Sequence, residues 1–213
     1  MALEEVIPLF PLSVVLFPYS KLPLYIFEER YKLMIKECMD DNAVFGINFF
    51  SENKIHNIGC TASVNEIVNT SATGEMNIVS LGKERYILND YELNANGYYE
   101  GNIKLLEDDT REFDKEKMKK TVKAYNELVE TVYKGTVRKI DLHDIKWLDG
   151  KRSVAYLMAE KCGLSLEERQ QLLEIGSEDE RLDFIINYFG EVIPKMKEAD
   201  KISTIIKGDG YIQ

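Results

Sequence analysis

"IPLFPLSVVLFP", residues Ile7 to Pro18, decides how the start of the chain folds. The stretch is almost entirely apolar and contains three prolines. Proline has no backbone N–H and is excluded from helix interiors, so the apolar residues between the prolines predict short extended segments that are buried on both faces. We expect such segments at Val6 to Leu9 and at Val14 to Phe17, and a third at Leu24 to Phe27, after Pro23.

The same stretch lacks the pattern of a targeting signal or of a membrane span. Glu4 and Glu5 precede it, whereas a secretory signal begins with basic residues, and its prolines interrupt the helical apolar run that such a signal requires. A membrane-spanning helix needs about 20 continuous apolar residues, and Lys21 ends this run too early. We therefore expect no membrane segment and no membrane partner.

The overall charge disfavours nucleic acid as a partner. The 213 residues contain 27 Lys and Arg against 37 Asp and Glu, and the formal net charge of −10 repels polyanions at long range. The segment Lys115 to Lys139 is locally basic, but its tyrosines fall on an apolar helical stripe, so we interpret it as a solvated helix face. Cys38, Cys60 and Cys162 are widely spaced and form no C-x-x-C pair, which predicts no disulfide framework and a cytoplasmic location.

Beyond the opening stretch, the apolar spacing predicts one helix and then a series of strands. Apolar residues from Tyr31 to Met39 recur at helical spacing, which predicts an amphipathic helix with Met39 on its buried stripe. From Phe45 the period changes to two, which is typical of a strand and places Phe50 on the face opposite Phe45. The segments that flank "TSATGE" predict a long hairpin, and a last strand, "YYEGNIKLL", places Tyr98 outward.

The character of the sequence changes at "EDDTREFD", Glu107 to Asp114, where charged residues replace the strand pattern. We place a boundary there, between residues 1–107 and 108–213. The second part predicts helices only, the first of them with Asp114 as its N-cap, and Pro194 ends or kinks the last. The later helices are expected at about residues 152–161, 166–175 and 178–192. Strands followed by helices give the fold class α+β.

An ordered set of motifs resembles the Lon protease N-terminal domain family, and more narrowly the short standalone proteins made of that domain alone. The motifs are the opening stretch with its continuation "YSKLPLYIFEERY", "FGI" at Phe45 to Ile47, "IGCTASVNEIV" at Ile58 to Val68 and "TGEMNIVSLGKERYIL" at Thr73 to Leu88. The last of these contains a G-x-x-R strand. Residues Leu164 to Phe189 are similar, less specifically, to the helical half of that domain. The chain departs from the family at Tyr19 and Ser20, where many relatives have a glycine after "FP".

The resemblance implies a PUA-like β-barrel subdomain with one early helix, residues 1–107, followed by an α-helical bundle subdomain, residues 108–213. In full-length Lon enzymes this part helps to recognise unfolded or tagged protein substrates, and other domains carry the chemistry. The nearest candidate for a phosphate-binding loop, "VSLGKERY", lacks the required earlier glycine and the following Ser or Thr. No catalytic motif accompanies His56 or His143. We therefore expect no catalytic residue, no metal site and no cofactor.

Exposed aromatic side chains are the candidates for a binding surface. Tyr19 lies in a predicted turn, and strand alternation points Phe50 and Tyr98 away from the core. Aromatic anchors with polar surroundings are typical of surfaces that bind peptides or protein partners. The alternative is that helices cover this outer face of the strands.

The sequence thus predicts a non-catalytic module that binds unfolded polypeptide segments or a protein partner and acts as an adaptor in protein quality control. The alternative hypothesis is a PUA-like protein that binds a small molecule or RNA, which would require a concave pocket with convergent polar groups. The sequence leaves open whether the protein forms a homo-oligomer.

Overall fold

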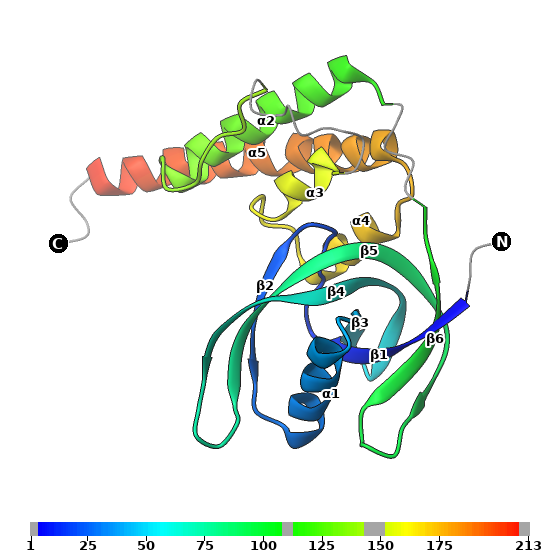
Figure 1. Ribbon diagram of the computed structural model, residues 1–213. Helices are drawn as coiled ribbons and strands as arrows, with labels where there is room; N and C mark the ends of the chain where they lie inside the picture. The colour runs from blue at the N-terminus through cyan, green and yellow to red at the C-terminus, as the bar shows by residue number, and fades with distance from the viewer. Residues whose placement is uncertain (1–3, 108–112, 143–151, 209–213) are drawn as a thin grey trace. The chain divides into compact units, whose positions relative to one another are not determined.

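The computed structural model describes residues 4–107, 113–142 and 152–208, and the chain divides into two compact units (Figure 1). The β unit comprises residues 1–109 together with 165–176, and the helical unit comprises residues 110–164 and 177–213. Among the described elements, α1 lies between β2 and β3, and every other helix follows the last strand. This segregation of strands and helices confirms the α+β class. The boundary at residue 107 stays a prediction; residues 165–176, which the sequence assigns to the helical part, are grouped with the strands.

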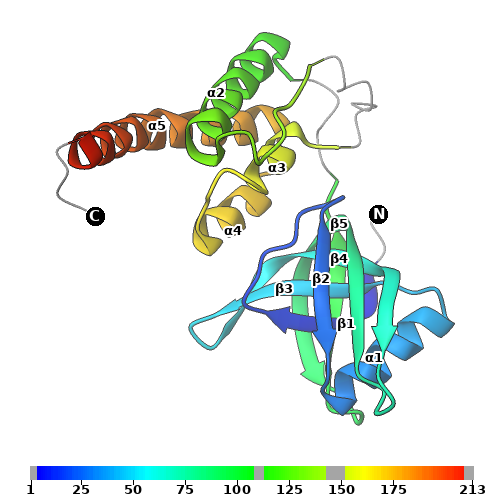
Figure 2. The same cartoon turned by 90° about the vertical axis from the view of Figure 1, so that its left-hand side faces the viewer.

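Six strands form one sheet that closes on itself. The strand order is β2-β5-β4-β3-β1-β6, and β5 also pairs with β6, so that five strands make a ring and β2 lies outside it, paired with β5 (Figures 1 and 2). Strands β1 and β3 are parallel, and β4 and β5 form the long hairpin that the sequence predicts. The strands are β1 (Glu4–Leu12), β2 (Lys21–Ile26), β3 (Phe45–Ser51), β4 (Lys54–Thr70), β5 (Met76–Leu93) and β6 (Tyr99–Leu105).

The turn between β1 and β2 packs closely against β5. The apolarity of Val14 to Phe17 predicted an extended segment, but these residues form no strand. They form a largely buried irregular segment, because the chain turns here toward β2. The N–H of Tyr19 donates to the carbonyl of Gly82, and the N–H of Gly82 donates to the carbonyl of Ser20, both at 2.9 Å. A Cβ at Gly82 would lie 2.3 Å from the Phe17 carbonyl oxygen, so this close approach requires glycine. Tyr19 has φ 65°, a left-handed conformation that bulky residues rarely adopt.

Helix α1 (Glu29–Asp40) packs on the sheet through a single face. Its buried residues are Tyr31, Met34, Ile35 and Cys38, which confirms the predicted stripe. Met39 was predicted to lie on that stripe, but its side chain is 40% exposed. Eight residues of an α-helix place Met39 about 80° around the axis from Tyr31, at the margin of the stripe.

Two hairpin turns bind α1 from either side. Arg30 Nη1 donates to the carbonyl of Gly97, in the β5–β6 turn, at 3.4 Å. Lys32 Nζ donates to the carbonyl of Thr73, in the β4–β5 turn, at 3.0 Å. The helix is thus held between the two turns by side chains from its own first turns.

Side chains fill the ring of strands. A buried cluster inside it contains Ile7, Leu9, Ile55, Tyr86, Leu88 and Ile103. The hydroxyl of Tyr86 donates to Asn48 Oδ1, and both residues are fully buried. A Cβ at Gly46 or at Gly59 would lie 2.3 or 2.6 Å from atoms of the Tyr86 ring and hydroxyl. Tyr86 therefore fills the space next to Gly46 and Gly59 inside the ring.

Helix α4 (Leu166–Glu174) belongs to the β unit because side chain and backbone groups of the strands contact it. Arg85 Nη1, on β5, donates to the carbonyl of Leu173 at 2.7 Å, and Gln170 Nε2 donates to the carbonyl of Ile58, on β4, at 3.1 Å. A cation at the carbonyl end of a helix also complements the helix dipole. Gly82 and Arg85 are the two fixed positions of the G-x-x-R motif, so one short segment contacts both the β1–β2 turn and α4.

The helical unit contains α2 (Lys115–Tyr133), α3 (Val154–Ala159) and α5 (Glu178–Gly208). The rings of Tyr125 and Phe189 pack between α2 and α5, with centroids 6.3 Å apart. Helix α5 continues through Pro194, although the sequence predicts an end or a kink there. Proline removes one backbone hydrogen bond, and Pro194 lies beyond Phe189, the last residue of α5 that is buried among those whose side chains the structure describes. No helix in the described part of the chain is long and apolar enough to cross a membrane.

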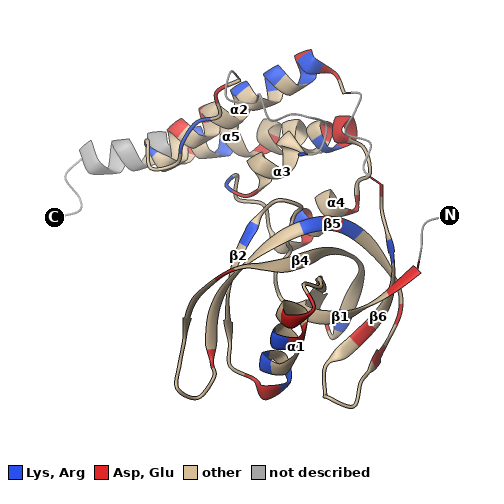
Figure 3. Cartoon of the chain, in the orientation of Figure 1, with Lys and Arg blue, Asp and Glu red and all other residues tan. Residues whose placement is uncertain are grey.

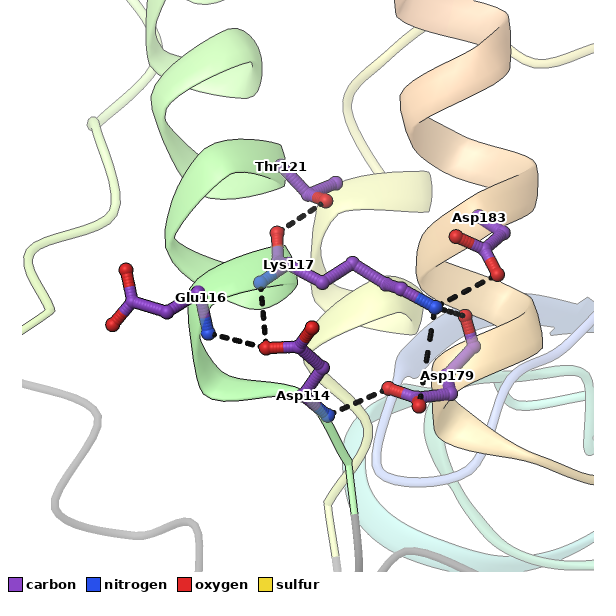
Figure 4. Close-up of polar contacts among 6 residues, drawn as sticks. All are labelled: Asp114, Glu116, Lys117, Thr121, Asp179 and Asp183. Carbon is purple, nitrogen blue, oxygen red and sulfur yellow. Dashed lines mark hydrogen bonds and ion pairs between the residues drawn. The ribbon is translucent and has the colours of Figure 1, made fainter.

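Polar contacts join the first turns of α2 and α5 (Figure 4). Asp114 caps α2 as predicted, and its carboxylate accepts from the N–H groups of Glu116 at 2.8 Å and Lys117 at 3.1 Å. Lys117 Nζ donates to Asp183 Oδ2 at 2.8 Å, and the N–H of Asp114 donates to Asp179 Oδ1 at 2.7 Å. These contacts fix the position of α2 along α5.

Candidate functional site

A groove runs beside α1 on the surface of the β unit. One wall is the helix, and the other is the tip of the β4–β5 hairpin, which Lys32 holds close through the carbonyl of Thr73. This first part of the groove encloses about 380 Å³. It is lined by Glu29, Lys32, Leu33, Lys36, Met39, Thr73, Gly74 and Met76.

A second hollow continues the groove toward the end of α1. Met39 lines both hollows, and the second encloses about 290 Å³ between the helix end and β4. Its other lining residues are Cys38, Asn42, Ala43 and residues 63–67. The two hollows together are called the α1 groove. At 1.5 Å per residue the 12 residues of α1 extend about 18 Å, the length of about five residues of extended peptide.

The lining of the α1 groove exposes apolar side chains that no described element of the β unit covers. Leu33, Met39 and Ile67 are 38%, 40% and 41% exposed. Adjacent exposed apolar side chains mark interaction sites. Methionine is unbranched and polarisable, so Met39 and Met76 can adapt to partners of different shape. The groove can therefore accept apolar side chains without demanding one particular residue.

The charges along the groove differ from those of the β unit as a whole. The β unit contains 20 Asp and Glu against 9 Lys and Arg, whereas the middle of α1 carries two lysines between acidic ends (Figure 3). Lys32 is engaged, since its Nζ lies 2.5 Å from a carboxylate oxygen of Glu29. Lys36, in the first hollow, and Glu66, in the second, form no ion pair with any residue that the structure describes.

Strand β2 carries an exposed aromatic pair. The rings of Tyr25 and Phe27 stack with centroids 5.7 Å apart, and the two side chains are 53% and 56% exposed. A hydrogen bond with Glu75 is the main cause that raises the pKa of Tyr25 above its ordinary value. The pair leaves one hydrophobic surface next to a carboxylate, on the side of β2 opposite Leu24 and Ile26.

Tyr19, the first residue that the sequence predicts to bind a partner, lies outside the α1 groove. Its side chain is 38% exposed and lines a separate hollow of about 450 Å³ with Val44, Thr61 and Leu105 among its neighbours. The exposure expected for Tyr19 is confirmed, and its role in binding stays a prediction.

Phe50 and Tyr98 line neither the α1 groove nor the hollow beside Tyr19. Phe50 is 36% exposed, as expected for its face of β3. The exposure predicted for Tyr98 is wrong, because its side chain is only 4% exposed and its hydroxyl donates to Glu37 Oε2, on α1, at 2.6 Å. Alternation along β6 identified the face correctly, but α1 covers that face.

The described residues hold no group of three or more His, Cys, Asp and Glu arranged to bind a metal ion. His56 Nε2 lies 3.1 Å from Ser51 Oγ, and its ring stacks on Phe49. His143 lies outside the described residues. Burial, with smaller contributions from nearby carboxylates, raises the pKa of the Cys38 thiol to about 11, so this thiol stays protonated near neutral pH.

The sequence pattern of the ATP-dependent protease La (LON) substrate-binding domain matches residues 6–189. The chain belongs to this family. The match includes both walls of the α1 groove as well as the G-x-x-R segment and α4. A comparison with curated proteins gave no match.

Solved structures of Lon N-terminal domains share the fold of this family member. A Lon N-terminal domain protein from Xanthomonas campestris is 20% identical, with a TM-score of 0.68 over 86% of this chain and 98% of that chain. The N-terminal domain of the Mycobacterium avium complex Lon protease is 14% identical, with a TM-score of 0.63 over 88% of this chain and 100% of that chain. These likenesses extend the family assignment to the three-dimensional arrangement.

Sequence reasoning missed the α1 groove and the Tyr25–Phe27 pair. The period-two pattern of "KLPLYIF" contains the signal for the pair, since Leu24 and Ile26 alternate with Tyr25 and Phe27. Leu33 also carried a signal, because it is an apolar residue off the buried stripe of α1. Neither signal shows that the β4–β5 turn stands beside the helix.

Proposed function

We propose that this member of the Lon substrate-binding domain family binds unfolded polypeptide segments in the α1 groove. The observation that carries the proposal is the exposure of the Leu33, Met39 and Ile67 side chains, which line the two hollows of the α1 groove. Unfolded segments expose apolar side chains on an extended backbone, and the groove has the length for about five such residues.

The mode of binding follows from the edge of the sheet. Among the described strands, β2 pairs with β5 alone, so its other edge is the place where an added strand would pair. Pro23 lies in the middle of β2 and has no N–H, and Lys21 is exposed at its start. Both features protect an edge against strand addition. We therefore place the segment in the groove, where side chains supply the affinity.

We further propose that the protein acts by binding alone, as a cytoplasmic adaptor for a separate ATP-dependent protease. The family match is to a substrate-binding domain, and Cys38, Cys60 and Cys162 are buried thiols that form no disulfide with a described residue, as suits a reducing compartment. Affinity purification from the native cell should recover an ATP-dependent protease in amounts comparable with the protein. Its absence from such a preparation contradicts the adaptor role and leaves peptide binding intact.

The groove is tested with a fluorescent, uncharged peptide of about ten residues that carries several leucines and blocked termini. Fluorescence anisotropy gives its dissociation constant. Leu33→Asp should weaken binding about tenfold, because an apolar contact worth roughly 1.5 kcal/mol is replaced by a carboxylate that must lose water. Circular dichroism verifies that the variant folds.

Leu93→Asp is the matched control, since Leu93 is an exposed leucine of the same unit, 59% exposed, that does not line the groove. It should leave the dissociation constant within about twofold of the wild-type value. Tyr19→Ala and Phe50→Ala test the surface predicted from the sequence with the same peptide. Loss of binding in these two variants, with Leu33→Asp unaffected, would place the site away from the α1 groove.

A further inference from the structure

The two hollows of the α1 groove carry opposite charges. Lys36 lines the first hollow beside Leu33 and Met76, and Glu66 lines the second beside Ile67. Met39 lies between them, because it lines both hollows. Neither charge is neutralised by an ion pair with a described residue, so each is available to a bound segment.

The other charges near the groove are committed within the protein. Lys32 contacts Glu29 and the Thr73 carbonyl, and Glu37 accepts the hydrogen bond of the Tyr98 hydroxyl. Gly74, at the hairpin tip, has no side chain and adds no charge to the first hollow. The electrostatic pattern that a ligand meets inside the groove is therefore one cation and one anion, separated by apolar surface.

We propose that the α1 groove selects extended apolar segments that carry an acidic residue at one end and a basic residue at the other, with the acidic residue at Lys36 and the basic residue at Glu66. This inference rests on the proposed function, since it names the chemistry of the segments that the groove binds. Complementary charges across an interface favour one pairing and penalise the like-charged alternative. Because the peptide backbone can run in either direction, both sequence orders fit, whereas two acidic or two basic ends do not.

The net charge of the β unit cannot by itself produce a preference for segments with one acidic and one basic end. An excess of acidic residues attracts any basic segment at long range and repels any acidic one, and salt screens that effect beyond about 10 Å. A preference for one acidic and one basic end over two basic ends can come only from a local cation. Lys36 is the lysine of the groove that is left to supply it.

Four peptides of about five residues test the proposal, each with one leucine-rich core and blocked termini, so that their two end positions span the length of the groove. Their two end positions hold Glu and Lys, Gln and Gln, Glu and Glu, or Lys and Lys. At low ionic strength the wild-type protein should bind the Glu/Lys peptide about twofold to fivefold more tightly than the Gln/Gln peptide, the range of an exposed ion pair. Lys36→Glu should change the preference to the Lys/Lys peptide, and Glu66→Lys should change it to the Glu/Glu peptide.

Two control variants change the net charge equally at positions outside the groove. Lys54→Glu and Glu92→Lys lie on exposed positions of β4 and β5, and neither residue lines the groove. Both should preserve the wild-type preference for the Glu/Lys peptide. Equal shifts in the groove variants and in the controls would assign the selection to net charge and overturn the proposal.

The Gln/Gln peptide separates this proposal from the proposed function. If it binds and Leu33→Asp weakens it, the groove is a peptide site whatever the charged peptides do. Equal affinity for all four peptides in that case overturns only the charge selection. If none of the four peptides binds, the peptide-binding function is refuted together with the inference that rests on it.

Discussion

Arg85 on β5 donates a hydrogen bond from Nη1 to the carbonyl oxygen of Leu173 in α4, at 2.7 Å and across 88 residues of sequence. Arg85 is only 3% exposed, and a buried guanidinium is stable only where its N–H groups have partners. The last turn of a helix offers carbonyls without partners in the helix itself. The pairing therefore satisfies both groups and explains why α4 belongs to the β unit although the segments before and after it belong to the helical unit.

Replacement of Arg85 by methionine should destabilise the protein and loosen α4. The variant keeps a long apolar side chain but leaves the Leu173 carbonyl without this donor, which costs about 1.5–3 kcal/mol for a hydrogen bond to a charged group. Urea unfolding measures the change in the free energy of unfolding. Hydrogen exchange of the α4 amides should increase more than that of the amides of α1.

Lys83→Met is the control, because Lys83 lies two residues away on the same strand and is partly exposed. It should change the free energy of unfolding by less than about 0.5 kcal/mol. An Arg85→Met protein as stable as this control would show that α4 is held mainly by apolar packing.

Gly82→Ala should destabilise the β unit. The new Cβ would lie 2.3 Å from the Phe17 carbonyl oxygen, a backbone atom that cannot move without displacing the β1–β2 turn. We expect a loss of about 1–3 kcal/mol in the free energy of unfolding.

Gly190→Ala is the opposite case, since Gly190 lies in α5 with nothing within 4 Å of the added Cβ. It should stabilise the helical unit by about 0.5–1 kcal/mol, and both effects are measured by thermal and urea unfolding.

Tyr19 pairs a bulky side chain with a left-handed backbone, φ 65°. Tyr19→Gly should leave the free energy of unfolding unchanged or raise it by up to about 1 kcal/mol, because relief of the backbone cost offsets the lost ring and the greater freedom of the unfolded chain. Tyr19→Val should lower it by more than about 1 kcal/mol, since a β-branched residue fits this conformation worst. A valine variant more stable than the glycine variant contradicts the strain at this turn. Both are measured by thermal unfolding monitored by circular dichroism.

The elements could be predicted from the sequence because their signals are local. Period two from Phe45 and the stripe that begins at Tyr31 record burial within a few residues, and the structure confirms the strand and the helix. The α1 groove could not be predicted, since it forms where Lys32 meets Thr73, 41 residues away. The predicted exposure of Tyr98 was wrong for the same reason. Alternation separates the two faces of the strand, but only the path of α1 decides which face is covered.

The cap of α2 predicts a dependence of stability on pH. Hydrogen bonds from the N–H groups of Lys117 and Glu116 hold the pKa of the Asp114 carboxyl below the ordinary value of 3.8. Because the pKa is lower in the folded protein, the unfolded chain binds the proton more readily. The stabilisation by Asp114 is therefore present above pH 3.8 and is lost as the pH falls through the folded value.

Asp114→Asn keeps an oxygen acceptor at the cap but removes the charge. It should be less stable than the wild type at pH 7, and the difference should shrink toward zero as the pH is lowered below 3.8. Asp90→Asn, at an exposed position of β5 whose carboxylate forms no hydrogen bond with a described residue, measures the effect of removing one negative charge elsewhere. Urea unfolding of the three proteins at a series of pH values gives the comparison. A deficit of Asp114→Asn that persists unchanged at the acidic end would mean that cap geometry, and not the charge, stabilises the start of α2.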